Sequence, residues 1–231
     1  MDTQTQHQDE QVITSRGVRI PVDLPGLTPR LMDFLRADDY ETRESEAVLK
    51  IVRRGDRVVD LGAGIGYLSA LMVQRCKPRI VHAIEANPNL IPGIARVMEA
   101  NNITNVVIEN AILGPAEAEV NFYVRRSFVA SSLLPEPAGS VTEVVKVPMK
   151  PARETFAALQ ADVLVCDIEG AEVDLIPRLD LTGLRAAVVE LHPQNIGLKG
   201  VGRVFDAMSQ AGLIYNPRRS NAKVVTFSRP E

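Results

Sequence analysis

A glycine-rich stretch directly after a short apolar segment constrains the fold of this chain more than any other feature. The apolar segment, residues 57–61, contains Val58-Val59, a β-branched pair typical of a buried parallel strand. A helix is predicted behind the glycines, from Tyr67 to about Cys76. Its first N–H groups face the turn, where glycines let a ligand approach the backbone closely. We therefore expect a nucleotide-type ligand over the loop of Gly62, Gly64 and Gly66.

The spacing of these glycines distinguishes between two kinds of ligand. A dinucleotide fingerprint has its third glycine where this chain has Tyr67. Asp60 stands just before the loop, and its carboxylate disfavours a pyrophosphate but favours a cation. S-adenosylmethionine (SAM) carries an ammonium and a sulfonium and no phosphate. The Asp-x-Gly-x-Gly-x-Gly pattern resembles motif I of class I SAM-dependent methyltransferases, so SAM is the expected cofactor.

The composition limits the class of protein. The chain has 231 residues, of which 45% are hydrophobic and 24% charged, which suits a globular protein. With a net charge of -3 and 4% aromatic residues, we expect no nucleic-acid partner. The two cysteines, Cys76 and Cys166, lack metal-ligand spacing, and no long apolar run is present. These features favour a cytoplasmic protein without membrane insertion, and a homodimer remains open.

Apolar segments alternate with helical segments along most of the chain, which predicts an α/β fold. The last two apolar segments have no helix between them and indicate an antiparallel strand at the sheet edge. Residues 118–147 interrupt this alternation of strands and helices, and their pattern predicts an antiparallel pair of strands with a long loop. The expected fold is Rossmann-like and of the class I methyltransferase type: a seven-stranded, mostly parallel sheet with an antiparallel last strand and an inserted β-hairpin and loop. The predicted division is a tail and arm packing on the main domain (residues 1–37), then the methyltransferase domain (residues 38–231).

Polar residues end successive apolar segments, where an open parallel sheet binds its ligands. Asp60 is expected to support the loop or receive the methionine part of SAM. The carboxylate of Glu85 suits both ribose hydroxyls. Asn110, by its side chain, or Ala111, by its backbone, is expected at the adenine edge. Asp167 is expected to lie centrally, beside both SAM and the acceptor.

Candidate catalytic residues follow the last two parallel strands. His192 is the best general base, with a structural histidine as the open alternative. Asp167 and Glu190 complete the predicted catalytic set. Together with His192 they leave a Mg²⁺ site possible, although no metal is expected from spacing alone.

With these residues assembled, the chain resembles the FkbM family of SAM-dependent methyltransferases from about Gly17 to Phe227. The resemblance implies O-methylation of a hydroxyl on a natural product, sugar or lipid-like acceptor. It also implies that Glu41 lies near the methionine end of SAM. Gly64 departs from the family, which often has Asn there. The matching pieces are Tyr40-Glu41, Asp60 to Gly66, Ile84 to Pro88, Asn110 to Gly114, Ser131 to Leu133, Asp167 to Glu172, and Val189 to His192.

The predicted function is therefore a SAM-dependent O-methyltransferase with a small-molecule hydroxyl acceptor. The alternatives are an NAD(P)-linked oxidoreductase and a non-catalytic SAM-binding protein. The acceptor is expected to contact the N-terminal arm and the loop of residues 123–139. The predicted cofactor-binding residues are Glu41, Asp60, Gly62, Ala63, Gly64, Gly66, Glu85, Ala86, Asn110, Ala111 and Asp167.

Overall fold

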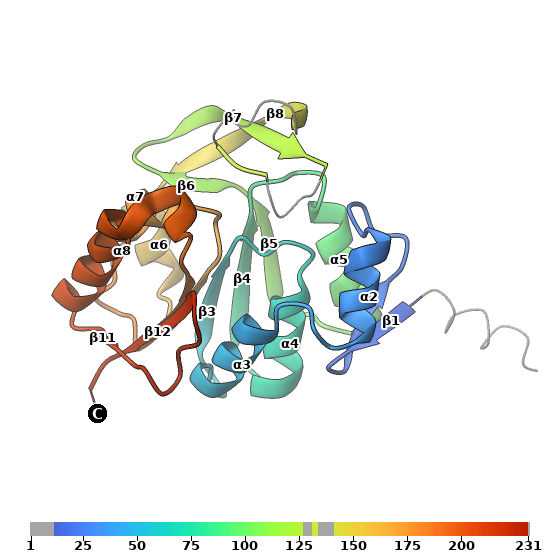
Figure 1. Cartoon of the computed structure of the whole chain (residues 1–231), viewed down its shortest axis with the longest axis horizontal. Coiled ribbons are helices and arrows are strands. Elements are labelled where there is room, and N and C mark those ends of the chain that lie inside the picture. The colour runs from blue at the N-terminus through green and yellow to red at the C-terminus, as the bar shows by residue number, and fades with distance from the viewer. Residues whose placement is uncertain (1–11, 127–130, 134–140, 231) are drawn as a thin grey trace, which may run out of the picture.

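The central element of the fold is a seven-stranded sheet with the order β11-β12-β10-β9-β3-β4-β5 (Figure 1). The computed structural model describes residues 12–126, 131–133 and 141–230. All neighbouring strands from β10 to β5 pair in parallel, whereas β12 pairs antiparallel with both β10 and β11. The strands are β3 (Arg57–Leu61), β4 (Ile80–Glu85), β5 (Val106–Asn110), β9 (Val163–Cys166), β10 (Ala186–Glu190), β11 (Ile214–Tyr215) and β12 (Val224–Ser228).

This order confirms the Rossmann-like methyltransferase fold and its antiparallel last strand. The chain passes from β3 outward through β4 to β5, then returns to the other side of β3 at β9. The order therefore reverses at β3, and in open α/β sheets this switch point is where the crevice for a ligand forms. β3 carries Asp60 and leads directly into the glycine loop.

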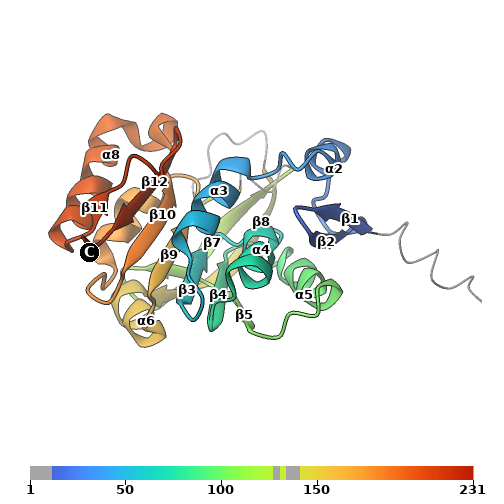
Figure 2. The ribbon, with the colours of Figure 1, turned by 90° about the horizontal axis from the view of Figure 1, so that it is seen from below.

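Helices cover both faces of the sheet (Figure 2). Val58 packs with the layer of α3, α4 and α5, whereas its neighbour Val59 packs with the layer of α6 and α8. Alternate strand residues thus fill opposite cores, so both must be apolar, as the sequence of β3 shows. The helices are α2 (Pro29–Arg36), α3 (Thr42–Ile51), α4 (Tyr67–Cys76), α5 (Ile91–Ala100), α6 (Ala152–Leu159), α7 (Glu172–Leu175), the short η3 (Ile176–Arg178) and α8 (Pro193–Gln210).

The N-terminal arm packs against the α4 and α5 side of the molecule. It consists of a hairpin, β1 (Val12–Ser15) and β2 (Val18–Pro21), followed by α2. Val18, Ile20 and Leu35 are fully buried in the same core as α4 and α5. The division of the chain at residue 37 remains a prediction, and the tail of residues 1–11 lies outside the described residues.

A second, three-stranded sheet lies across the end of the molecule at which β5 finishes (Figure 1). Its strands are β6 (Ile112–Gly114), β7 (Ala118–Arg125) and β8 (Val141–Pro151). β7 and β8 form the expected antiparallel pair. The pair is not inserted into the main sheet, however, because β6 pairs in parallel with β8 and draws it into a separate sheet. Most of the predicted loop between β7 and β8 lies outside the described residues.

The starts of two helices depend on local residues. α5 begins at Ile91, after a turn in which the Asn87 side chain accepts a hydrogen bond from Asn89 N. α8 begins at Pro193 and has a break at Gly197 (φ 63). Across residues 12–126 and 141–230, no helix combines the length and apolar character that a membrane crossing requires.

The packing of α6 on the sheet yields a stability prediction. Phe156 is 2% exposed in the α6 and α8 core. Phe156→Ala should lower the free energy of unfolding by about 3–5 kcal/mol, because the cavity cannot close fully. The matched change Phe34→Ala, at a residue that is 38% exposed, should cost less than about 1 kcal/mol. Urea unfolding of both variants compares them, and equal losses would contradict this view of the core.

Candidate cofactor and active site

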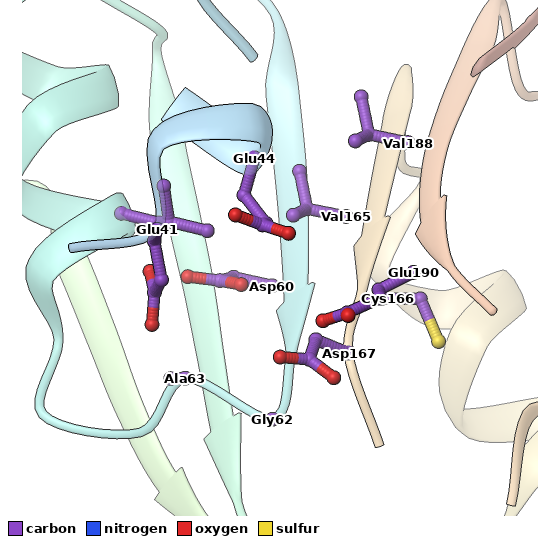
Figure 3. A pocket seen from close by; sticks show the side chains of 11 residues that line it. Glu41, Glu44, Asp60, Gly62, Ala63, Val165, Cys166, Asp167, Val188 and Glu190 are labelled. Atoms are coloured by element: carbon purple, nitrogen blue, oxygen red, sulfur yellow. The ribbon is translucent and has the colours of Figure 1, made fainter. Parts of the chain in front are cut away.

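A pocket opens at the carboxyl ends of β3, β9 and β10, beside the start of α3. Its floor is apolar, with Val165 and Val188 from neighbouring strands. Its rim is acidic, and the carboxylates converge on one space (Figure 3). Three acids expected in the site, Asp60, Asp167 and Glu190, therefore do come together. The lining residues are Glu41, Glu44, Asp60, Gly62, Ala63, Leu68, Val165, Cys166, Asp167, Val188 and Glu190.

The glycine loop fits against the end of β9 without room for a side chain. Gly62 has φ 81, and a Cβ there would lie 1.8 Å from the backbone oxygen of Asp167. Gly66 also has φ 81, and its Cβ would lie 2.9 Å from Ile94 Cγ2. Both positions therefore require glycine for conformation and for space. α4 begins directly after Gly66, so its free N–H groups face the loop.

Glu85 holds the loop from below. Its two carboxylate oxygens accept hydrogen bonds of 2.8 Å from Gly64 N and Asn87 N. Burial raises the pKa of Glu85 to about 7, although these amides oppose the shift. A carboxylate has about four acceptor positions, so Glu85 can accept further hydrogen bonds. Its expected contact with ribose hydroxyls remains a prediction.

Asn110 and Ala111 already use their donors within the protein. Asn110 Nδ2 donates to the backbone oxygens of Glu85 (2.8 Å) and Ala86 (3.0 Å). Ala111 N donates to Glu85 O at 3.2 Å. These bonds tie the end of β5 to the end of β4. For an adenine edge, Asn110 offers its side-chain oxygen and Ala111 its carbonyl, and that role stays a prediction.

Asp60 and Glu41 face the pocket with raised pKa values. Asp60 is 2% exposed and accepts a hydrogen bond of 2.5 Å from Ser69 Oγ. Burial raises its pKa to about 6, against the effect of Ser69. Burial likewise raises the pKa of Glu41 to about 8, against a hydrogen bond with Tyr40. Glu41 also has φ 44, a left-handed conformation that non-glycine residues rarely adopt. Strain of this kind is common at functional sites.

Four carboxylates surround the imidazole of His192. Its Nδ1 is 3.3 Å from Glu172 Oε1, which also accepts a 2.9 Å hydrogen bond from His192 N. Its Nε2 is 3.4 Å from Glu169 Oε2, 3.6 Å from Asp167 Oδ1 and 4.0 Å from Glu190 Oε2. Burial alone would lower the pKa of His192. The hydrogen bond with Glu172 and the charges of the neighbouring acids have the larger effect, so the net shift of the pKa is upward. A raised pKa leaves less neutral imidazole near pH 7, so the predicted role as general base now requires removal of a proton first.

Three acids of the site were not assigned roles from the sequence. Glu172 is fully buried, and burial raises its pKa while His192 lowers it, with a net lowering. Glu169 faces His192 from a left-handed backbone (φ 55). Glu44 lines the pocket one helical turn after Glu41. The segment from Asp167 to Glu172 contains three acids in six residues, and this density is the sequence feature that could have identified Glu169 and Glu172.

These features fit SAM. The pocket is acidic where a sulfonium and an ammonium need counter-charges, and the loop admits a ligand against bare backbone. Asp167 Oδ1 is buried and has no hydrogen-bond partner within the described residues. Buried polar atoms normally have a hydrogen-bond partner, and a bound ligand can supply it here. Fold and site together define a class I SAM-dependent methyltransferase.

Comparison with known proteins places the chain within that class. A family model described as the TRM5/TYW2 methyltransferase domain matches residues 33–126. The tRNA wybutosine-synthesizing protein 2/3/4 of Arabidopsis thaliana is 40% identical over 62 residues, which cover 25% of this chain and 6% of the relative. The tRNA(Phe) (4-demethylwyosine(37)-C(7)) aminocarboxypropyltransferase of Methanocaldococcus jannaschii is 33% identical over 64 residues, which cover 28% of this chain and 26% of the relative. The matches thus span a small part of either relative.

The solved structure of methyltransferase FkbM from Methylobacillus flagellatus KT has the same fold. It superposes with a TM-score of 0.53 and 14% identity, over 85% of this chain and 52% of that chain. At this identity the likeness shows the fold alone. The FkbM resemblance is therefore supported only as far as the class I methyltransferase, with SAM as the cofactor.

Two expectations from the sequence are wrong. The family model and both curated relatives concern tRNA-modifying enzymes, which overturns the small-molecule O-methyltransferase and its NAD(P)-linked alternative. The same matches contradict the expectation of a small-molecule hydroxyl acceptor and no nucleic acid. Net charge misled here, because it averages over the whole chain and does not report where the charges lie.

The fit of Gly62 against β9 can be tested with a matched pair of variants. Gly62→Ala and Gly55→Ala both place alanine at a similar positive φ (81 and 87), which costs about 1–2 kcal/mol in each. Only at Gly62 does the new Cβ meet backbone, since nothing lies within 4 Å at Gly55. Gly62→Ala should lose SAM binding in calorimetry while Gly55→Ala retains it. Equal SAM affinities would show that the loop tolerates a side chain.

The raised pKa values predict opposite effects of pH on stability and on SAM binding. Glu41, Glu85 and Asp60 have pKa values of about 8, 7 and 6, above their ordinary values of 4.5, 4.5 and 3.8. The cofactor-free folded state therefore holds more protons than the unfolded state, so its stability falls as pH rises from about 4 to about 8. SAM affinity should rise between pH 6 and 8, as the carboxylates ionise. Thermal unfolding and calorimetry measure the two trends, and a SAM affinity independent of pH would contradict this assignment.

Proposed function

We propose that the chain is the catalytic domain of a SAM-dependent methyltransferase that modifies RNA, with tRNA as the substrate class. The observation that carries the proposal is the family-model match to the TRM5/TYW2 methyltransferase domain over residues 33–126. That range contains Glu41, the glycine loop, Glu85 and Asn110, so it includes most of the predicted cofactor site. The names of both curated relatives support the same substrate class.

The acidic residues of the predicted site and His192 have roles in this proposal. SAM supplies a methyl group made electrophilic by its sulfonium. Glu85 accepts hydrogen bonds from ribose hydroxyls, and Asp60 and Glu41 provide negative charge toward the methionine end. The role of Glu41 follows from the FkbM resemblance and from its place in the pocket. Asp167 and Glu190 line the pocket from β9 and β10, with His192 adjacent to both, and this is the side assigned to the acceptor in the proposal.

An acidic pocket constrains how a nucleic acid can bind. Phosphates are repelled by the carboxylates, so the proposal requires a single base to enter while its backbone stays outside, as in enzymes that extrude their target base. Two exposed cations stand beside the acids. Arg43 lies at the start of α3, two residues after Glu41. Burial raises the pKa of Glu44, and the positive charge of Arg43 opposes that rise. Burial also raises the pKa of Glu169, and the positive charge of Lys223 opposes that rise. Both can contact phosphates outside the pocket.

Transfer of label from SAM tests the proposed reaction. We expect tritium from methyl-labelled SAM to appear in a pool of unmodified tRNA transcripts after incubation with the protein. Carboxyl-labelled SAM is the control, because its label stays on the co-product when only the methyl group moves. Retention of carboxyl label on RNA would contradict methyl transfer. If SAM binds normally and no label reaches any tRNA, the substrate class is wrong.

Matched variants in the same experiment locate the RNA surface. Arg43→Ala and Lys223→Ala should each weaken tRNA binding several-fold and lower its salt slope by about one charge. SAM affinity should stay unchanged in both. Arg75→Ala, an exposed cation in the last turn of α4 and away from the loop, is the control. Equal loss of tRNA affinity in all three variants would indicate non-specific attraction.

A further inference from the structure

A group of potential metal-ligand atoms lies at the end of the pocket formed by β9 and β10, on the opposite side of Asp60 from the start of α4. Asp167, Glu190 and His192 each present one ligand atom, and these atoms all lie within 4.8 Å of one another. Figure 3 shows the carboxylates of Asp167 and Glu190 adjacent at the ends of the two strands. Two carboxylates and an imidazole are a donor set suited to a divalent cation.

The setting of the imidazole is a second, independent observation. The His192 side chain is 4% exposed, and Glu172 lies 3.3 Å from its Nδ1. An acceptor at Nδ1 places the proton of a neutral imidazole there and leaves the lone pair of Nε2 facing the cluster. A carboxylate behind the ring is the arrangement that orients metal-binding histidines. Nε2 itself makes no hydrogen bond among the described residues.

Among the described residues, the carboxylates around Nε2 have no cationic partner other than the imidazole of His192. Asp167 Oδ1 is buried without a hydrogen-bond donor within the described residues. In residues 12–126, 131–133 and 141–230, no Lys or Arg nitrogen forms an ion pair with Asp167, Glu169 or Glu190. When the imidazole is neutral, three carboxylates and the lone pair of Nε2 thus face a common point, and no Lys or Arg of the described residues lies between them. The side chains of Asp167, Glu169 and Glu190 are partly buried (29%, 32% and 22% exposed), and carboxylates withdrawn from water in this way favour a paired or metal-bound state.

We infer that Asp167, Glu190 and His192 form a binding site for a divalent cation of the Mg²⁺ or Mn²⁺ type, with Glu169 as a further oxygen ligand. His192 Nε2 lies 3.6 Å from Asp167 Oδ1 and 4.0 Å from Glu190 Oε2. Ligand bonds of about 2.1 Å put neighbouring donors roughly 3 Å apart, so small side-chain rotations close the site. Mn²⁺ is a suitable probe, because carboxylate oxygens, which make up most of this ligand set, favour Mg²⁺ and Mn²⁺.

The ion would also take part in substrate binding because of its position. Only this second role of the ion rests on the proposed function. A bound divalent cation offsets two negative charges on the acceptor side of the pocket. It also leaves open coordination positions toward the space beside SAM, where an oxygen of the acceptor can bind. The site thereby reduces the repulsion between an acidic pocket and a polyanionic substrate.

Mn²⁺ binding, measured without SAM or RNA, tests the site itself. We expect the electron paramagnetic resonance signal of free Mn²⁺ to be lost on addition of the protein, and pulsed measurements to detect coupling to a ¹⁴N nucleus. His192→Gln should abolish the nitrogen coupling. Glu190→Gln should weaken Mn²⁺ binding about tenfold or more. His82→Gln, a histidine on β4 outside the cluster, is the control and should bind as the wild type does.

The outcomes separate this inference from the proposed function. A cooperative unfolding transition in each variant confirms that the variant is folded, and the wild-type nitrogen coupling needs no variant. Absence of Mn²⁺ binding at millimolar ion, absence of nitrogen coupling, or equal binding in Glu190→Gln and wild type would each overturn the site. None of these measurements uses tRNA, so a failed tRNA assay leaves the result on the ion unaffected.

Discussion

Repulsion among buried carboxylates is the constraint on which the site depends. Glu41, Asp60, Asp167 and Glu190 surround one pocket, and burial shifts the pKa values of the first three upward. A carboxylate without a counter-charge in such a place destabilises the folded chain. A ligand with positive charge would offset this repulsion, so the predicted cofactor and the acidic pocket are electrostatically complementary.

The rest of the fold holds this arrangement in place. Two cores, one on each face of the sheet, fix β3, β9 and β10 in register, so their last residues meet at one edge. Leu61 O accepts a 2.9 Å hydrogen bond from Asp167 N, and Gly62 then turns against the Asp167 carbonyl. The position of Asp167 is therefore set by backbone contacts with β3. The backbone of Asp167 cannot shift without breaking these contacts, so only rotation of the side chain can move its carboxylate.

The parts of the fold that depend on local pattern were predictable from the sequence. The limits of α4 follow from the glycine loop and agree with the structure. The acids at strand ends follow from parallel topology. The strand β6 was not predicted, because three residues carry too little pattern and its pairing partner lies more than 30 residues away. The role of Glu172 depends on a histidine 20 residues further along the chain, and no spacing rule links the two.

The joint between the two sheets has a thermodynamic consequence. Ala111 alone separates β5 from β6, and its N–H is bonded to Glu85 O. A displacement of the three-stranded sheet therefore acts directly on the residue that also holds the glycine loop. If a ligand on the three-stranded sheet shifts Ala111 and thereby changes the affinity for the cofactor, linkage requires that the cofactor change the affinity for that ligand by the same factor.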